Sequence, residues 1–298
     1  MKRETKNMLV LMVVAVMAAG AAWSAQPVDE TYPVASDATI EVENLAGKLA
    51  FKGWGQAAVE VKGVLGDGVE RIDIEEDEDG LYIEVVWDEE FHGRQQTDTD
   101  LAIMIPENAS LGVETVSASI SVERIFGEVE LETVSGAVVI SGSPSTLDVE
   151  NVSGKISVEN APPGTNLESV SGQIEIQSAS GRFDAENVSG SIVIRGGSLA
   201  GADIETVSGN ITCHAVPGMD GDVDMETMSG TIELMVDAGA SASYDLNTFS
   251  GGINNEIGPE PRRTSKYTPG KELSFNTGPG GPRISLSSFS GTIKLMTR

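Results

Sequence analysis

Cysteine, histidine and aromatic residues are scarce in this sequence. Its 298 residues include one cysteine, Cys213, and two histidines, His92 and His214, and aromatic residues make up 5%. A single cysteine excludes an internal disulfide framework and a paired-cysteine metal motif. Because the two histidines lie far apart, we expect neither to belong to a catalytic triad or a metal site. Cys213 occupies an apolar position of a predicted strand, where we expect a buried small hydrophobe rather than a reactive thiol.

The motifs of common enzyme families are also missing. The sequence has no G-x-S-x-G elbow, phosphate loop or dinucleotide-binding fingerprint. The acidic stretch at residues 75–80 lacks the ligand spacing of an EF-hand, and the glycine-aspartate calcium nonapeptide is absent. Long helical periodicity is absent too, whereas glycine occurs 34 times. These features favour an all-β protein rich in turns, without catalytic or cofactor-binding residues.

Positive charge is in short supply. The chain has 19 Lys and Arg against 46 Asp and Glu, a formal net charge of −27. Nucleic acids and anionic lipid surfaces attract basic patches, so neither is an expected partner. Basic proteins, polycations and divalent cations suit this charge, and calcium is the one cofactor that we consider.

The only long apolar run lies at the N-terminus. A basic start is followed by apolar residues 8–23 and by small residues at 22–25, the form of a secretory signal peptide. The run is shorter than the roughly 20 residues that a spanning helix needs, so cleavage near Ala25 is preferred to an uncleaved anchor. Removal of residues 1–25, which carry a net charge of +2, leaves −29. We therefore predict that the protein is exported to the periplasm or the cell envelope, which includes the cell surface. After cleavage we expect no membrane-spanning segment.

The phrase "DVENVSGKISVEN" at residues 148–160 recurs along the chain. Its serine, Ser153, has counterparts at Ser117, Ser135, Ser171, Ser189, Ser208, Ser229, Ser250 and Ser290. The first five of these nine serines are 18 residues apart, and the later gaps are 19, 21, 21 and 40. A fixed period of this kind indicates stacked structural repeats.

Each repeat alternates apolar and polar residues on both sides of its serine. Apolar residues stand three and five positions after it, as in Ile156 and Val158, and four and six positions before it, as in Leu147 and Val149. Such alternation predicts two short strands with one buried face each, meeting at a Ser-Gly corner. Eighteen residues at about 3.3 Å each give a perimeter of about 60 Å. We predict a single-stranded, three-sided β-solenoid, a parallel β-helix with a right-handed coil preferred over a left-handed one.

The Ser-Gly corners are expected to be structural. Many equivalent serines argue against one activated nucleophile, and glycine is expected there for its access to positive φ. The Thr, Asn or Ser two positions before each serine should join it in hydrogen-bonded ladders. The corner residues are Ser117, Ser135, Gly136, Ser153, Gly154, Ser171, Gly172, Ser189, Gly190, Ser208, Gly209, Ser229 and Gly230.

The ends of the array depart from the repeat. Residues 26–110 are predicted to form a β-rich cap with one degenerate coil, in which Ala46 replaces the serine, and a hairpin pairing residues 72–74 with 81–85. A loop is expected at residues 92–100. The regular solenoid is assigned to residues 111–251. Residues 252–298 are predicted to form an insertion loop and a C-terminal capping coil, with seven Lys or Arg against three Glu from Ser250 onward. For the insertion, a solvated loop with a capping hairpin is preferred to a partner site.

Acidic residues recur at two outward positions of each repeat. Three residues before the serine stand Glu114, Glu132, Glu150, Glu168, Glu186, Glu205 and Glu226, and five before it stand Glu130, Asp148, Asn166, Asp184, Asp203, Asp224 and Asp245. Stacking would place these columns about 6.6 Å apart, with successive coils about 4.8 Å apart. A solvated face that opposes aggregation is one interpretation. The other is a face for divalent cations or a basic partner, with Glu132, Asp148, Glu150, Glu168, Asp184, Glu186, Asp203 and Glu205 as candidate metal ligands.

Several phrases together resemble the bacterial putative-adhesin β-strand-repeat family, a domain of unknown function. They are "VENLAGKLAFKGW", "LAIMIPENASLGVETVSASISV", the repeated "VSG-x-I-x-I" and the closing "SFSGTIKL". The resemblance covers roughly residues 36–298 and implies a β-solenoid-like fold and an envelope location. It carries no catalytic or binding residues over. Departures are Ala46 in place of serine, Ala118 in place of glycine and the strong acidity.

Three functions follow from these observations. The preferred one is a non-enzymatic, exported structural or interaction module of the envelope, whose partner is an envelope protein or polysaccharide. The second is a cation-responsive surface on the acidic columns. The third is a polysaccharide-active β-helix enzyme, which would require one coil with converging acid and base groups.

Overall fold

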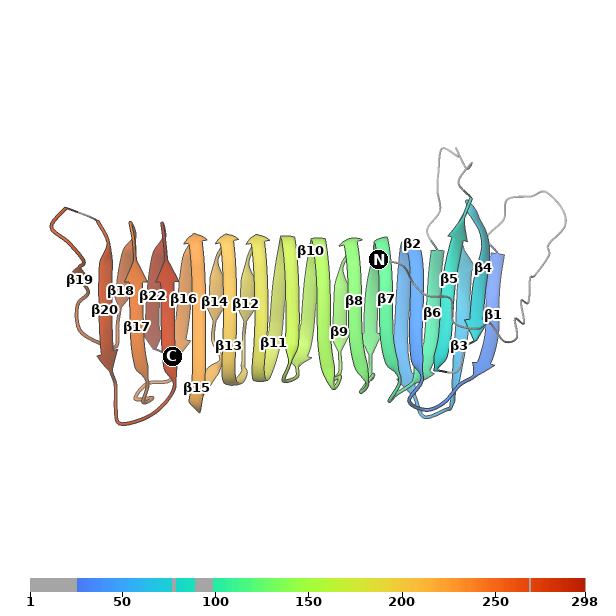
Figure 1. Cartoon of the computed structure of the whole chain (residues 1–298), viewed down its shortest axis with the longest axis horizontal. Helices are drawn as coiled ribbons and strands as arrows, with labels where there is room; N and C mark the ends of the chain where they lie inside the picture. The colour runs from blue at the N-terminus through green and yellow to red at the C-terminus, as the bar shows by residue number, and fades with distance from the viewer. Residues whose placement is uncertain (1–25, 77–78, 89–98, 268, 298) are drawn as a thin grey trace, which may run out of the picture.

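The computed structural model describes residues 26–76, 79–88, 99–267 and 269–297. These residues form 22 β-strands joined in one sheet that coils about a long axis, and they contain no helix (Figure 1). It follows that this part of the chain has no helix that could cross a membrane. The predicted signal segment at residues 1–25, His92 and most of the loop at 92–100 lie outside the described residues.

The central coils stack with the register that the repeat predicts. Ser135 pairs with Ser153 and Ser153 with Ser171, and farther along Ser189 pairs with Ser208 and Ser208 with Ser229. All of these pairings are parallel, so the fold is the expected β-solenoid. The strands are β7 (Ser110–Glu123), β8 (Glu128–Ser135), β9 (Val138–Ser141), β10 (Thr146–Ala161), β11 (Thr165–Ser189), β12 (Ile192–Ile194), β13 (Gly197–Ser208), β14 (Ile211–Cys213), β15 (Val216–Ser229) and β16 (Thr231–Val236).

The central coils have three sides of unequal length, of which the one before the Ser-Gly corner is the longest. We call the strand before the Ser-Gly corner the first side and the strand after it the second side. The coil that begins at Thr146 pairs with the next coil through residues 147–153 on the first side, 154–158 on the second and 160–161 on the third. The expected right-handed sense stays a prediction.

The core lies inside the coils and consists of aliphatic ladders. The inward residues Leu147, Val149, Ile156 and Val158 are buried, as are their equivalents in the neighbouring coils. No single coil could bury these side chains alone, so stacking creates the core. The inward assignment made from sequence alternation is confirmed.

The corner glycines are required mainly because successive coils approach closely. A Cβ added to Gly154 would lie 2.0 Å from the carbonyl oxygen of Gly136, and one added to Gly172 would lie 1.9 Å from that of Gly154. Gly154 has a φ of 135°, but Gly172 has no φ in the left-handed region. Positive φ, the reason expected from the sequence, therefore explains only some of the corners.

At the N-terminal end the degenerate coil is internal. Its strand β2 pairs in parallel with β7 on one edge and with β5 and β6 on the other. Beyond these, β4 pairs antiparallel with β5, as the predicted hairpin requires, and β3 and β1 continue antiparallel from β6. The strands are β1 (Gln26–Pro33), β2 (Thr39–Trp54), β3 (Ala58–Leu65), β4 (Val69–Glu76), β5 (Gly80–Trp87) and β6 (Thr99–Pro106).

At the C-terminal end the last coil in sequence is not the last in space. Strand β21 pairs in parallel with both β15 and β17, and β22 pairs with both β16 and β18. The coil of Ser290 thus lies between the coils of Ser229 and Ser250. The prediction of a C-terminal capping coil is wrong, because this coil is inside the stack. Antiparallel β20, with β19 beside it, covers β17 instead. The strands are β17 (Ser243–Thr248), β18 (Gly252–Asn255), β19 (Arg262–Arg263), β20 (Lys271–Asn276), β21 (Arg283–Ser288) and β22 (Thr292–Thr297).

Candidate interaction surface

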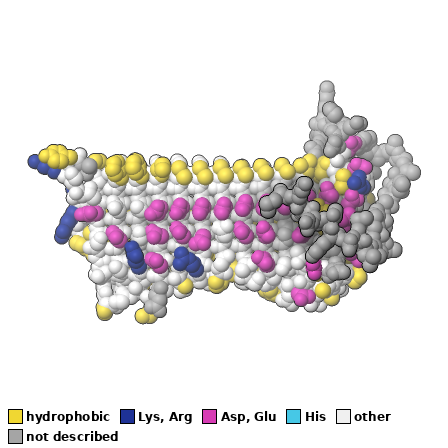
Figure 2. Space-filling model, in the orientation of Figure 1, with side chains coloured by type: hydrophobic (Ala, Val, Ile, Leu, Met, Phe, Trp, Pro, Cys, Tyr) yellow, Lys and Arg dark blue, Asp and Glu magenta, His cyan; other side chains and the backbone are white. Residues whose placement is uncertain are grey.

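The outward face of the first side carries three columns of side chains. They come from the residues five, three and one positions before the corner serine, because alternate residues of a strand share a face. We name them the aspartate column, the glutamate column and the apolar ridge. Figure 2 shows the ridge as a nearly continuous row of hydrophobic side chains along one edge of the molecule, with rows of acidic side chains beside it.

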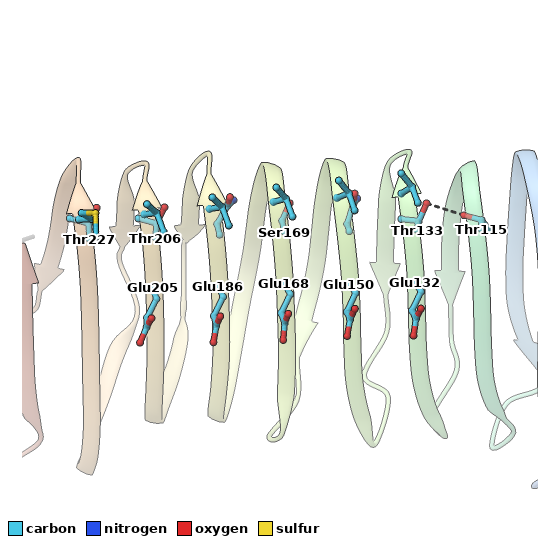
Figure 3. A pocket seen from close by; sticks show the side chains of 18 of the residues that line it. Thr115, Glu132, Thr133, Glu150, Glu168, Ser169, Glu186, Glu205, Thr206 and Thr227 are labelled. Carbon is cyan, nitrogen blue, oxygen red and sulfur yellow. Dashed lines mark hydrogen bonds between the residues drawn. The ribbon is translucent and has the colours of Figure 1, made fainter. Parts of the chain in front are cut away.

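The glutamate column is longer than the sequence predicted. Pairing places Glu43 beside Glu114 and Glu84 beside Glu43, in front of the seven expected members. The side chains of successive members lie in one line (Figure 3). The column ends beyond Glu226, where the inserted coil supplies Ser287. In spatial order its members are Glu84, Glu43, Glu114, Glu132, Glu150, Glu168, Glu186, Glu205 and Glu226.

The aspartate column is shorter and less uniform. Asp148, Asp184, Asp203 and Asp224 belong to it as predicted, but Asp245 is not next to Asp224. The inserted coil places Ser285 between Asp224 and Asp245, so the prediction of adjacency is wrong.

One member of the aspartate column is uncharged. The amide nitrogen of Asn166 donates to Asp148 at 3.1 Å and to Glu168 at 3.3 Å, and so it connects the two columns. A neutral donor at this point relieves repulsion among the surrounding carboxylates.

Four carboxylates of these columns have pKa values above the ordinary value. Burial raises the pKa of Glu132, Glu186 and Glu205, and the neighbouring carboxylates raise it further. Burial, followed by Asp224 and Asp184, likewise raises the pKa of Asp203. The shifts have the direction expected when like charges are stacked coil upon coil.

The columns do not converge into a chelating cluster. Among the described residues no group of three or more Asp, Glu, His or Cys side chains is arranged to hold a metal ion. Each coil contributes at most one carboxylate to each column, so the arrangement is a line of separate charges. The geometry suits an extended positively charged partner better than one coordinated ion.

The apolar ridge is a feature that the sequence interpretation missed. Ten half-exposed side chains follow one another along the corner, with exposures of 38–58%. At its C-terminal end the rings of Phe249 and Phe289 stack with centroids 4.7 Å apart. In spatial order the members are Leu45, Val116, Val134, Val152, Val170, Val188, Val207, Met228, Phe289 and Phe249.

A groove runs beside the ridge. Coil after coil, it is lined by a glutamate, the polar residue that follows it and the ridge residue. The labelled side chains of Figure 3 show the glutamates in one row and the polar residues in a second row nearer the corner. The groove is therefore lined by three parallel rows of side chains along the axis. One row is acidic, one carries hydroxyl or amide groups, and one is apolar.

The polar residues of this groove are buried, and the hydrogen bonds that join them to the corner serines involve the serine main chain. The Ser189 N–H donates to Asn187 Oδ1 at 3.0 Å, and Thr133 donates to the carbonyl oxygen of Ser135 at 3.4 Å. Thr115 donates to Thr133 at 2.9 Å, but Asn151 and Asn187 donate to the corner carbonyls of the preceding coils, at 3.2 Å and 2.9 Å. The corner serines, Ser153 among them, are largely exposed. Asn151 and Asn187 therefore bind backbone oxygens at the turn, which fixes the corner.

One ion-pair cluster lies on the second side of the solenoid. Glu175 is buried, and its carboxylate accepts hydrogen bonds from Lys155 of the preceding coil, from Arg195 of the following coil at 2.8 Å and from Gln177 at 2.8 Å. The hydrogen bonds and charges of Lys155 and Arg195 lower the pKa of Glu175 to about 2. A carboxylate with so low a pKa stays ionised at neutral pH, so it connects coils and does not act as a general acid or base.

Cys213 is fully buried in the core. Desolvation raises the pKa of its thiol to about 11, so it remains protonated and unreactive at neutral pH. This outcome agrees with the small hydrophobe expected at that position. The neighbouring His214 follows strand β14 and is partly exposed.

Three solved structures of putative adhesins are similar to this chain. A putative adhesin of Bacteroides fragilis shares 14% identity, covers 93% of this chain and 100% of its own, and has a TM-score of 0.39. Putative adhesins of Parabacteroides distasonis and Parabacteroides merdae share 12% and 10% identity. Their TM-scores are 0.40 and 0.39, and they cover 92% and 91% of this chain and 98% and 96% of their own.

The chain matches no curated protein. A family model matches residues 70–296, which include the central solenoid, both strands of the N-terminal hairpin and the inserted C-terminal coil. Strands β1 to β3 precede the matched range, although β2 continues the same columns. The chain belongs to the Toastrack DUF4097 family.

Proposed function

We propose that this protein is an exported, non-enzymatic β-solenoid that serves as an adhesin-like structural or interaction module of the bacterial cell envelope. The observation that carries the proposal is the first side of the solenoid, where the glutamate column and the apolar ridge run side by side over eight coils, from the coil of Glu43 to that of Glu226. Repetition of this kind offers an extended binding surface instead of one reaction centre. The N-terminal sequence supports export, because it has the form of a signal peptide.

Export is tested by locating the mature N-terminus. Mass spectrometry of protein isolated from the periplasmic and envelope fractions of the native host should give an N-terminus between Trp23 and Pro27. A soluble cytoplasmic protein that retains Met1 would overturn the proposed location.

Interaction is tested by retention of envelope components on the immobilised mature chain. The matched comparison is a variant in which Glu150, Glu168 and Glu186 are changed to Gln, which preserves the side-chain shapes and removes three adjacent charges. We expect the wild-type chain to retain a specific envelope component and the variant to retain less. Equal retention by both chains and by a bead without protein would reject the interaction role.

A second candidate function is a cation-responsive surface. It is supported by the raised pKa values of Glu132, Glu186 and Glu205, to which neighbouring carboxylates contribute. Calcium would relieve that repulsion through diffuse association along the columns, since hard cations accept carboxylate oxygens readily. Retention that requires millimolar calcium would favour this candidate, and retention unchanged by a chelator would exclude it.

A further inference from the structure

The apolar ridge and the glutamate column lie side by side from the coil of Glu43 to that of Glu226, and the ridge continues through Phe289 and Phe249. They are two residues apart on each strand, which corresponds to about 6.6 Å, and nine steps of about 4.8 Å give the ridge a length of about 43 Å. Contiguous exposed apolar patches larger than a few hundred Å² commonly mark interaction surfaces. By contrast, Val139, on the second side, is 44% exposed but has serines, Ser121 and Ser157, as its neighbours in the adjacent coils.

The charge beside the ridge restricts what can cover it. A second copy of the chain would bring another −29 charge and another acidic face toward the first. Among the described residues, Arg182 and Arg283 lie on the first side at the margin farthest from the ridge, and Arg71 and Lys271 lie on β4 and β20, the strands that flank its two ends. Repulsion between like charges therefore disfavours self-association and favours a cationic partner.

The shape of the surface suits an α-helix lying along the axis. The ridge presents one apolar side chain about every 4.8 Å, and a helix presents one apolar position per turn, about every 5.4 Å. Lys or Arg residues beside the apolar stripe of such a helix would reach sideways to the glutamate column. We propose that the ridge and the glutamate column together bind a basic amphipathic helix of a partner protein, with its apolar stripe on the ridge and its basic side chains on the glutamates.

This inference rests on the proposed interaction function and names its surface and partner chemistry. The probe is an 18-residue peptide with leucines on one helical stripe and lysines beside it, about 27 Å long when helical. Fluorescence anisotropy with the mature chain should show saturable binding that weakens with salt. Circular dichroism should show that the peptide becomes helical when bound. A peptide of the same composition in scrambled order is the control for charge alone.

Matched variants of the protein separate the two columns. A triple valine variant should raise the Kd of the peptide about tenfold at constant salt; its substitutions are Val152→Ser, Val170→Ser and Val188→Ser. The control Val139→Ser, on the second side, should leave Kd unchanged. A triple glutamate variant should raise the Kd of the peptide at low salt and make that Kd less dependent on salt; its substitutions are Glu150→Gln, Glu168→Gln and Glu186→Gln.

Specific outcomes would overturn the inference. Equal binding of the scrambled peptide, or an unchanged Kd in the triple valine variant, would show that charge alone acts. Sedimentation of the wild-type chain as a dimer and of the valine variant as a monomer would assign the ridge to a second copy. Binding to phosphatidylcholine vesicles that the valine variant loses would assign it to lipid. Any of these results, combined with specific retention of an envelope component, refutes the helix but preserves the proposed function.

Discussion

The ion-pair cluster at Glu175 offers a sharp test of the electrostatics. A change in pKa from about 4.5 to about 2 corresponds to about 3 kcal/mol at 1.36 kcal/mol per unit. The side chains of Lys155 and Arg195 are 46% and 50% exposed, and water screening reduces this figure. We therefore expect Glu175→Gln to lower the free energy of unfolding by about 1.5 kcal/mol at pH 7.

The same substitution should change the pH dependence of stability. The folded-state pKa of Glu175 lies below its unfolded value, so its contribution is fully present above about pH 5 and is lost as pH falls toward 2. The glutamate column acts in the opposite direction, because the raised pKa values of Glu132, Glu186 and Glu205 make the native state bind more protons. Its repulsion is relieved as pH falls into the carboxylate range. The difference between wild type and Glu175→Gln should thus close between about pH 5 and pH 2.

Urea unfolding at pH 7, 5 and 3, followed by far-ultraviolet circular dichroism, measures this difference. Glu233→Gln is the matched control, since Glu233 lies on the same side and meets one partner, Lys294, at 3.4 Å. It should cost about 0.5 kcal/mol or less. The reasoning is refuted if the two variants lose the same stability, or if the Glu175→Gln difference is independent of pH.

Three further predictions concern the core, the acidic face and the inserted coil. Ile174→Asp places an unpaired carboxylate in the core and should cost several kcal/mol, so a variant that melts like the parent would contradict the inward assignment. A triple variant with Gln at Glu150, Glu168 and Glu186 should have a higher melting temperature than the wild type when calcium is absent. Millimolar calcium should raise the melting temperature of the wild type more than sodium does at equal ionic strength, and this rise should be smaller in the variant. The same calcium response in both chains would refute this prediction. Deletion of residues 283–297 should abolish hydrogen-exchange protection in β17, β18 and β20 while β8 to β11 stay protected, and unchanged protection would reject the inserted coil.

The fold was predictable because its information is local and repeated. Each coil has apolar residues at fixed distances from its serine, and a regular stack is the arrangement that buries all of them at once. The glutamate column followed from the same alignment. Glu43 could have been found too, because it stands three residues before Ala46 in the degenerate copy. The apolar ridge could have been found in the same way. The residue before each serine stands two positions after the glutamate, so both side chains point outward from the same face of the strand.

The order of the C-terminal coils could not be obtained in this way. The choice of Ser290 or Ser250 as the neighbour of Ser229 depends on pairings between distant segments, and both copies carry the same motif. A long gap between repeats indicates an insertion but not where the chain returns. Glu175 escaped notice for a different reason, because it occurs in one coil only and its partners come from the coils on either side.

Photo-crosslinking in the native host tests most directly that the first side is the interaction surface. p-Benzoylphenylalanine is placed at Val170 on the ridge or at Val139 on the second side, two positions with similar exposure. The account predicts a discrete crosslinked product with an envelope protein from position 170, suppressed by the basic amphipathic peptide, and none from position 139. The same products from both positions, or a product only from position 139, would contradict it.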